Sequence, residues 1–348
     1  MKRLLAVVAA ITAAVVVTTA CSDTAAEPDT LILLTHDSFA IPADVLDEFE
    51  AETGIAVEIL TGGDAGTMVN QAILTKDNPL ADVLFGVDNT FLSRTLEAGI
   101  FSPHEAAGLD AVHPDLIVDP QSRVTPMDFG DVCLNYDRLA LPDDVAPQNL
   151  EALTNPEHAG QLVVQDPATS SPGLAFLLAT IATFPEGASY DWQDYWDDLI
   201  ANDVEITAGW EEAYNGAFSG GAGRGDRPIV VSYASSPPAA VIFSDPPLTE
   251  APTGVVAASC FRQIEFAGVL AGAGNEEAAG KLVDFMLSKR FQETMPLNMF
   301  VFPARSDANL PAEFVEFTEV PADPITMAPD EIGAGRDEWI KAWTELVR

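Results

Sequence analysis

Three aspartates, Asp37, Asp64 and Asp88, each come shortly after an apolar run that is typical of a buried β-strand. In a parallel sheet the carboxyl ends of the strands meet at one edge, and ligands of open α/β sheets bind just beyond that edge. We therefore expect the three carboxylates to lie at a common rim, where they could neutralise a cation or accept hydrogen bonds from a ligand. The runs are LILLT (31–35), IAVEIL (55–60) and ADVLFGV (81–87).

A second group of polar residues, Ser170-Ser171-Pro172-Gly173, stands where a helix is expected to begin. Free backbone N–H groups and serine hydroxyls at a helix start suit a phosphate or another polar tail. The same residues also suit a plain helix cap with proline in the first turn. The sequence leaves both readings open.

Motifs of catalysis are missing from the chain. It contains no GxSxG, HExxH or CxxC sequence. Its four histidines, at positions 36, 104, 113 and 158, do not have the spacing of metal ligands. We therefore expect a protein that is not an enzyme and that needs no metal or cofactor.

Two α/β units are expected to position these groups. In the first, the three runs alternate with helices over 43–52, ended by Gly54 as a C-cap, and over about 67–76. This βαβαβ order predicts a parallel sheet covered by helices. The second unit and the following segments comprise strands at 161–166, 204–207, 228–233 and 260–270, a helix from 173 to about 183, a helix pair at 275–295, a short VFPA run at 301–304 and a last helix at about 330–347.

Length and charge restrict the class of protein further. The 348 residues exceed the size at which one core keeps growing, so two lobes are expected. The formal net charge is −38, from 54 acidic and 16 basic residues. Phosphate backbones require Lys and Arg, so we exclude nucleic acid as a partner. The acids are scattered, which is typical of a solvated acidic surface.

The first residues have the pattern of an export signal. Lys2 and Arg3 precede an uncharged apolar stretch over 4–20, and Cys21 follows the small residues Thr19-Ala20. This arrangement resembles a bacterial lipoprotein signal, in which the cysteine is acylated, although Thr18 stands where Leu is usual. We expect a signal peptide over 1–20, a tether over 21–30 and a lipid on Cys21 at the outer face of the membrane; the alternative is an ordinary secretory signal.

The chain has three cysteines, Cys21, Cys133 and Cys260. An exported protein sits in an oxidising setting, where thiols tend to pair. If Cys21 carries lipid, Cys133 and Cys260 are left as a disulfide pair. Two unpaired buried thiols are the alternative.

Five segments in order resemble the thiamine-binding proteins of ABC importers, and the likeness extends from about Leu31 to Arg348. The segments are THDSF (35–39), ADVLFGVDN (81–89), QDPATSSPGL (165–174), AGWEEAY (208–214) and VVSYASSP (230–237). The resemblance implies an α/β, type II periplasmic-binding fold with two lobes and a ligand cleft between them. We expect lobe 1 over 31–131 and 266–305, lobe 2 over 132–265, and a C-terminal helical segment over 306–348 that packs back on the lobes.

The resemblance also implies a ligand and a set of contacts. A monomeric carrier would bind thiamine or thiamine phosphate and pass it to the membrane subunits of the importer. Trp210 and Tyr233 match aromatic positions of the family's cleft. The full set of expected ligand-binding residues is Asp37, Ser38, Asp64, Asp88, Ser170, Ser171, Gly173, Trp210, Tyr233 and Phe300.

Three departures from the family pattern concern the aromatic residues of the cleft. His36 stands where Tyr is common, Ala239 where a second aromatic is typical, and Phe300 where Trp is typical. A polyamine-binding protein of the same fold is the main alternative, because acids with Trp and Tyr also suit a flexible dication. A ferric-ion binder is less well supported, since the five tyrosines include no adjacent pair late in the second lobe.

Overall fold

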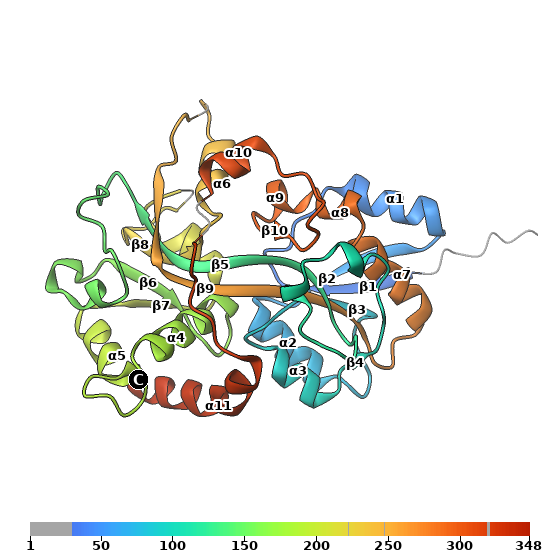
Figure 1. The fold of residues 1–348 in the computed structure, drawn as a ribbon, viewed down its shortest axis with the longest axis horizontal. Helices are drawn as coiled ribbons and strands as arrows, with labels where there is room; N and C mark the ends of the chain where they lie inside the picture. Colours follow the sequence, from blue (N-terminus) through green and yellow to red (C-terminus); the bar gives the residue numbers. More distant parts are fainter. Residues whose placement is uncertain (1–29, 222, 247, 319–320) are drawn as a thin grey trace, which may run out of the picture.

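The computed structural model describes residues 30–221, 223–246, 248–318 and 321–348 (Figure 1). The expected signal peptide, Cys21 and the tether up to residue 29 lie outside the described residues, and Thr30 belongs to β1. Within the described part of the chain, no helix combines the length and the apolar character needed to cross a membrane.

One mixed β-sheet passes through the whole molecule. Its strand order is β2-β1-β3-β9-β5-β8-β6-β7, with β4 paired to β9 and β10 to β5. The β2-β1-β3 and β8-β6-β7 ends are parallel, whereas β9 and β5 run antiparallel to their neighbours. The strands are β1 (Thr30–Thr35), β2 (Ala56–Thr61), β3 (Val83–Asp88), β4 (Phe101–Ser102), β5 (Thr125–Asp137), β6 (Leu162–Gln165), β7 (Glu205–Thr207), β8 (Ile229–Tyr233), β9 (Thr253–Leu270) and β10 (Phe302–Pro303).

Two long strands connect the parallel ends of the sheet. β5 has 13 residues and β9 has 18, and in Figure 1 they cross the molecule between the two groups of helices. We call the part built on β1–β3 lobe 1 and the part built on β6–β8 lobe 2. A disulfide between Cys133 of β5 and Cys260 of β9 joins the two crossing strands. The chain therefore passes between the lobes at strands that are bonded to each other along their length.

Helices cover both lobes. Lobe 1 carries α1 to α3 and α7 to α9, and lobe 2 carries α4 to α6 with the π-helical turn η5. Their bounds are α1 (Ala43–Thr53), α2 (Ala65–Leu74), α3 (Leu92–Ala98), α4 (Ser171–Thr183), α5 (Trp192–Ala201), η5 (Glu212–Ala217), α6 (Pro237–Ile242), α7 (Glu276–Met286), α8 (Lys289–Gln292), α9 (Met295–Asn298), α10 (Ala312–Phe317) and α11 (Pro329–Leu346), with short 3₁₀ turns η1 (Leu109–Ala111), η2 (Pro114–Leu116), η3 (Glu151–Thr154) and η4 (Pro156–His158).

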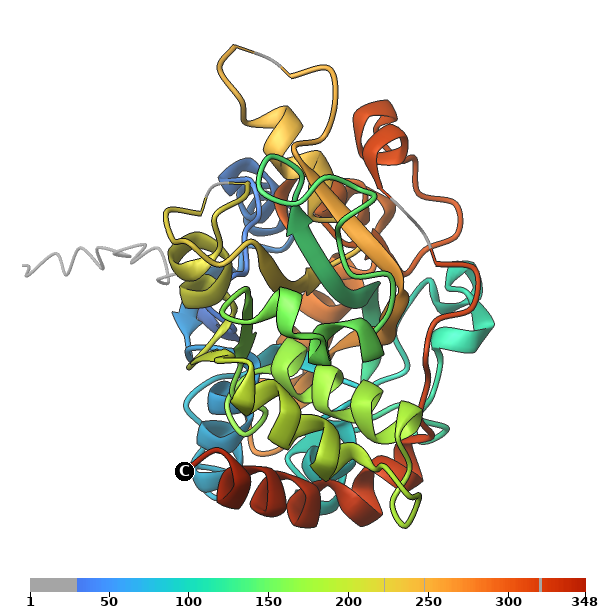
Figure 2. The same ribbon diagram turned by 90° about the vertical axis from the view of Figure 1, so that its left-hand side faces the viewer.

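The C-terminal helix α11 contacts both lobes. In Figures 1 and 2 it lies along the lower side of the molecule, away from α6 and α10. Its first half places the guanidinium of buried Arg336 4.6 Å over the ring of Phe91, beside α3. Its second half packs Trp343 edge-to-face on Trp196 of α5, with 5.4 Å between ring centroids.

Most of the expected elements are present within two residues of their predicted bounds. Gly54 ends α1 with φ 74°, which confirms the predicted left-handed C-cap. The helix pair expected at 275–295 is present as α7 and the short α8. One prediction needs correction: strand β9 begins at Thr253 rather than 260, because β5 continues to pair with it there.

Candidate ligand-binding site

A pocket of about 640 Å³ opens between the lobes. Lobe 1 contributes Ser38, after β1, and Phe300, after α9. Lobe 2 contributes the start of η5, the end of β8 and one side of α6. Four of the expected contact residues therefore line one pocket: Ser38, Trp210, Tyr233 and Phe300.

Aromatic rings supply most of the flat surface of the pocket. Trp210 stacks on Tyr214 with 4.8 Å between centroids and 12° between planes, and its indole N–H donates to the Ser232 hydroxyl at 2.9 Å. Phe300 of lobe 1 meets Phe243 of lobe 2 edge-on, at 5.6 Å. These contacts hold the rings in place from both lobes, so a planar ligand would meet surfaces that are already oriented.

Tyr233 lies on the sheet at the end of β8. A β-carbon at Gly130 of β5 would lie 3.4 Å from the Tyr233 ring, an ordinary contact distance, so the ring lies over β5 at this position. Burial raises the pKa of the Tyr233 hydroxyl well above its usual value, and the nearby carboxylate of Glu265 adds to that shift. The hydroxyl therefore remains neutral and can act as a hydrogen-bond donor or acceptor.

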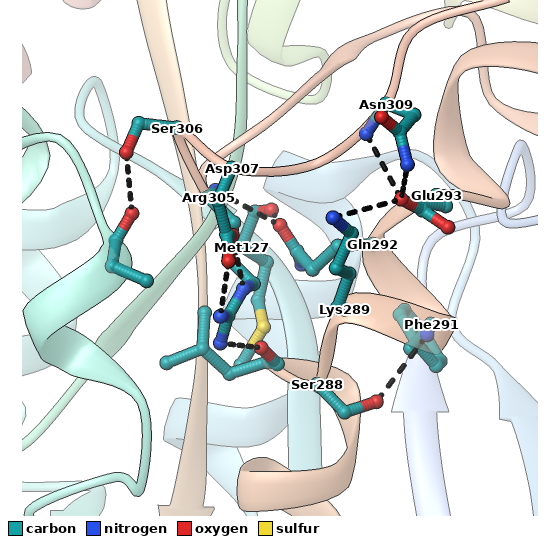
Figure 3. Close-up of polar contacts among 12 residues, drawn as sticks. Met127, Ser288, Lys289, Phe291, Gln292, Glu293, Arg305, Ser306, Asp307 and Asn309 are labelled. Carbon is teal, nitrogen blue, oxygen red and sulfur yellow. Dashed lines mark hydrogen bonds and ion pairs between the residues drawn. The ribbon is translucent and has the colours of Figure 1, made fainter.

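The segment that carries Phe300 has hydrogen bonds to both lobes. The Ser235 hydroxyl donates to the Phe300 carbonyl, and Phe300 itself has φ 55°. Further along, buried Gln292 donates to the Met127 carbonyl at 2.9 Å and accepts from the Arg305 N–H at 3.3 Å. Figure 3 shows this network at the base of the segment. The position of Phe300 therefore depends on both lobes.

Asp64 joins the lobes instead of facing the pocket. It is the N-cap of α2 and accepts from the Ala65 N–H at 2.7 Å. It also accepts from two N–H groups of lobe 2, those of Ser171 at 3.3 Å and Trp210 at 2.9 Å. Burial raises the pKa of Asp64, and the N–H bond from Trp210 opposes that shift.

Two glycines permit this close contact. A β-carbon on Gly66 would lie 2.7 Å from the backbone of Thr169, and one on Gly209 would lie 2.9 Å from Asp64 Oδ2. The Thr67 N–H donates to the Thr169 carbonyl at 3.2 Å beside them. The start of α2 is therefore packed backbone to backbone against lobe 2.

Asp88 is buried and does not lie at an open rim of the sheet, contrary to our expectation. It is the last residue of β3 and its side chain is fully buried. One oxygen accepts from the Thr90 hydroxyl at 2.7 Å, the Thr90 N–H and the Phe91 N–H, as in a turn that starts α3. Burial raises its pKa to about 7, and repulsion from Glu265 adds to the effect. Asp88 is thus a buried turn-forming residue next to the cleft.

A row of three buried carboxylates crosses the sheet beside Tyr233. Glu265 of β9 lies directly opposite both Asp88 of β3 and Asp128 of β5. Burial and the adjacent Glu265 raise the pKa of Asp128 well above its usual value. His36 Nε2 lies 3.6 Å from Glu265 Oε1; burial lowers the pKa of His36, but the carboxylate outweighs it and the pKa is raised. The described residues contain no cluster with the geometry of a metal site.

The expected anion-binding residues do not reach the pocket. Ser170 and Ser171 are buried at the start of α4, and Asp64 already takes the Ser171 N–H. A β-carbon on Gly173 would lie 2.5 Å from the Gln165 carbonyl, so this glycine serves helix–strand packing. Asp37 is exposed, and its N–H donates to the Gly63 carbonyl outside the pocket lining.

Sequence reasoning missed several residues of the site. Tyr214 belongs to the segment AGWEEAY (208–214) and stands four residues after Trp210. This spacing places two side chains on one helical face. Phe243 stands four residues after Ala239, and both residues line the pocket. For Asp128 and Glu265 the available signal was a carboxylate directly between two apolar residues, in MDF (127–129) and IEF (264–266).

Comparison with known proteins assigns the family. A family model described as bacterial extracellular solute-binding protein matches residues 78–318. The chain belongs to this family. The thiamine-binding periplasmic protein of Escherichia coli K12 is 31% identical over 325 residues, covering 91% of this chain and 93% of that protein. A solved periplasmic thiamin binding protein matches with TM-score 0.80 and 29% identity, over 92% of this chain and 96% of its own.

A ferric binding protein from Campylobacter jejuni has the same fold, with TM-score 0.72 and 19% identity over 91% of this chain and 99% of its own. These neighbours confirm the two-lobed type II periplasmic-binding fold. The solute-binding protein is therefore an extracytoplasmic carrier of the kind that serves ABC importers, and its relatives are carriers and not enzymes.

Proposed function

We propose that this solute-binding protein captures thiamine, or a phosphorylated form of it, in the pocket between its lobes and delivers it to an ABC importer. The observation that carries the proposal is the aromatic lining, in which Trp210, Tyr214 and Tyr233 of lobe 2 line the same pocket as Phe300 of lobe 1. Thiamine-binding periplasmic relatives that match nearly the whole chain support the same ligand.

The lining suits the chemistry of thiamine. Its aminopyrimidine and thiazolium rings are flat, and the thiazolium is cationic. A cation over a Trp face gains ~0.5–2 kcal/mol, and more where water is excluded. The pocket volume of about 640 Å³ is ample for a two-ring molecule. Glu211, at the pocket mouth, provides a negative charge within reach of the ligand.

Isothermal titration of ligand-free protein with thiamine, thiamine phosphate and spermidine tests this proposal. We expect thiamine to bind with a 1:1 stoichiometry and Trp210→Ala to weaken it. Trp192→Phe is a matched control, because Trp192 is a fully buried tryptophan of α5 away from the pocket lining. Binding of spermidine without either thiamine form would refute the ligand and leave the fold assignment intact.

A polyamine remains the alternative ligand, and the lining gives it less support. A flexible dication needs two well-separated carboxylates. Among the described residues that line the pocket, Glu211 is the one carboxylate. The spermidine titration distinguishes the two ligands directly.

We also propose that the mature protein is a monomer anchored through a lipid on Cys21, with lobe boundaries at 131/132 and 265/266 and a C-terminal segment from 306. The periplasmic relatives support export. Mass spectrometry of membrane fractions should find a lipid adduct on the Cys21 peptide that Cys21→Ser abolishes. A soluble mature protein with unmodified Cys21 would contradict the anchor.

A further inference from the structure

Two phenylalanines from different lobes meet at the mouth of the pocket. Phe243 ends α6 of lobe 2, and Phe300 follows α9 of lobe 1; both helices lie on the same side of the crossing strands (Figure 1). Both rings line the pocket, and their centroids lie 5.6 Å apart with 73° between the planes. Phe243 is 71% exposed, so it stands where the pocket opens to solvent. The pair therefore joins the two lobes at the pocket entrance.

Folding stability does not account for the position of Phe243. A ring that stays mostly in water gains little from burial. Its backbone is fixed nevertheless, since the Phe243 N–H donates to the Ala239 carbonyl at 3.0 Å. The next residue, Ser244, donates through its hydroxyl to the Val241 carbonyl at 2.7 Å and accepts from the Leu248 N–H at 2.8 Å. The structure thus holds an exposed aromatic ring in a defined place beside the pocket.

Phe300, the other member of the pair, has an unusual backbone conformation. Its φ of 55° lies in the left-handed region, which bulky residues rarely adopt. The Phe300 N–H donates to the Met295 carbonyl at 3.2 Å, and its carbonyl accepts from the buried Ser235 hydroxyl of lobe 2. Strain of this kind persists where surrounding contacts impose it, and it is frequent at functional sites. The contacts that orient Phe300 therefore come from both lobes.

We infer that Phe243 and Phe300 form a gate that closes the pocket behind the ligand, so that Phe243 controls how long the ligand stays bound; the inference rests on the proposed function. Opening a cleft moves one lobe away from the other, and a contact between rings of different lobes does not survive that motion. Release of the ligand therefore has to break the pair. The strength of an edge-to-face aromatic pair corresponds to an increase of about 3- to 10-fold in the release rate when the pair is lost.

Stopped-flow fluorescence with thiamine tests the gate, because Trp210 lines the pocket and reports whether it is occupied. Phe243→Ala should raise the dissociation rate constant by about 3- to 10-fold. The association rate constant should rise by no more than the same factor, since loss of the pair also favours the open form. Thermal unfolding should stay within about 1 °C of the wild type, because the ring is exposed.

Leu139→Ala is the matched control, because Leu139 is also a large exposed apolar residue and does not line the pocket. It should change neither rate constant. A Phe300→Leu background distinguishes a gate from a direct ligand contact, since leucine removes the second ring and keeps apolar volume. In that background Phe243→Ala should change the dissociation rate constant by less than about 2-fold, because its aromatic partner is already gone.

The outcomes separate the gate from the proposed function. Effects of the two substitutions that multiply would show that Phe243 acts on the ligand without Phe300, and would overturn the gate. An unchanged dissociation rate constant in Phe243→Ala, or a fall in its association rate constant, would also overturn the gate and leave thiamine capture standing. Failure of thiamine to bind the folded wild type would overturn the proposed function and the gate with it.

Discussion

Replacing Asp88 by asparagine should stabilise the protein above neutral pH, although the change removes a charge next to the ligand site. Burial raises the pKa of Asp88 to about 7 from 3.8, and repulsion from Glu265 contributes. One carboxylate oxygen accepts the hydrogen bonds from Thr90 and Phe91, and the Ser171 side chain of α4 also interacts with this carboxyl group and lowers its pKa. Asparagine keeps an acceptor for the bonds from Thr90 and Phe91 and replaces the other oxygen by a neutral N–H₂ group.

The size of the stabilisation by Asp88→Asn follows from proton linkage. Between pH 3.8 and 7 the folded protein holds a proton on Asp88 that the unfolded chain has lost, so stability falls as pH rises through this window. Each pH unit inside it corresponds to ~1.4 kcal/mol. Between pH 5 and 8, Asp88 can therefore lower the free energy of unfolding of the wild type by at most about 3 kcal/mol. Structural relaxation should reduce this loss to ~1–2 kcal/mol.

Thermal unfolding of ligand-free protein at pH 5, 6, 7 and 8 measures the effect. At this chain length ~1 kcal/mol corresponds to about 2 °C. We expect Tm of Asp88→Asn to exceed that of the wild type by about 2–4 °C at pH 8, with the difference shrinking toward pH 5. Asp77→Asn, an exposed site, should show no such trend. Parallel pH curves for Asp88→Asn and the wild type would show that Asp88 does not titrate with a raised pKa in the folded protein.

Three further predictions concern the aromatic contact, the polar network and the disulfide. Trp210→Ala should weaken thiamine binding by ~1–3 kcal/mol in calorimetry, through lost stacking and cation–π energy; unchanged affinity would place the ligand elsewhere. Gln292→Leu should lower the free energy of unfolding by ~2–4 kcal/mol in urea melts, because it leaves the Met127 carbonyl and other buried groups unpaired; a change below ~0.5 kcal/mol would contradict this. Alkylation of native, unreduced protein should label neither Cys133 nor Cys260, and reduction should destabilise it by up to ~4–5 kcal/mol; labelling of both would exclude the bridge.

Local patterns were enough to predict most of the parallel strands and the helices next to them, but not the crossing strand β5. Apolar runs of five to seven residues with turn residues after them mark β1, β2 and β3, and Gly54 marks the end of α1. These signals are local because strand and helix periodicity depends on near neighbours. The early start of β9 was missed, since the TGVVAAS residues extend as a strand only through their pairing with β5.

The candidate site was only partly predictable, because it depends on contacts between distant segments. Trp210 and Tyr233 line the pocket as expected, whereas Asp64 and Asp88, which looked alike in sequence, have different environments. Asp64 bonds across the lobes and Asp88 is enclosed by its own turn. Glu265 lies opposite Asp88 and Asp128 because of the register of three strands that are far apart in sequence. The spacing of these residues along the chain could not show this arrangement.

Native mass spectrometry can show directly whether the protein captures thiamine. Ligand-free protein is mixed with equimolar thiamine and spermidine, and the mass of the bound molecule is read from the intact complex. We expect one thiamine per chain, lost in Trp210→Ala. A complex with spermidine, or a folded protein that retains neither molecule, would contradict it.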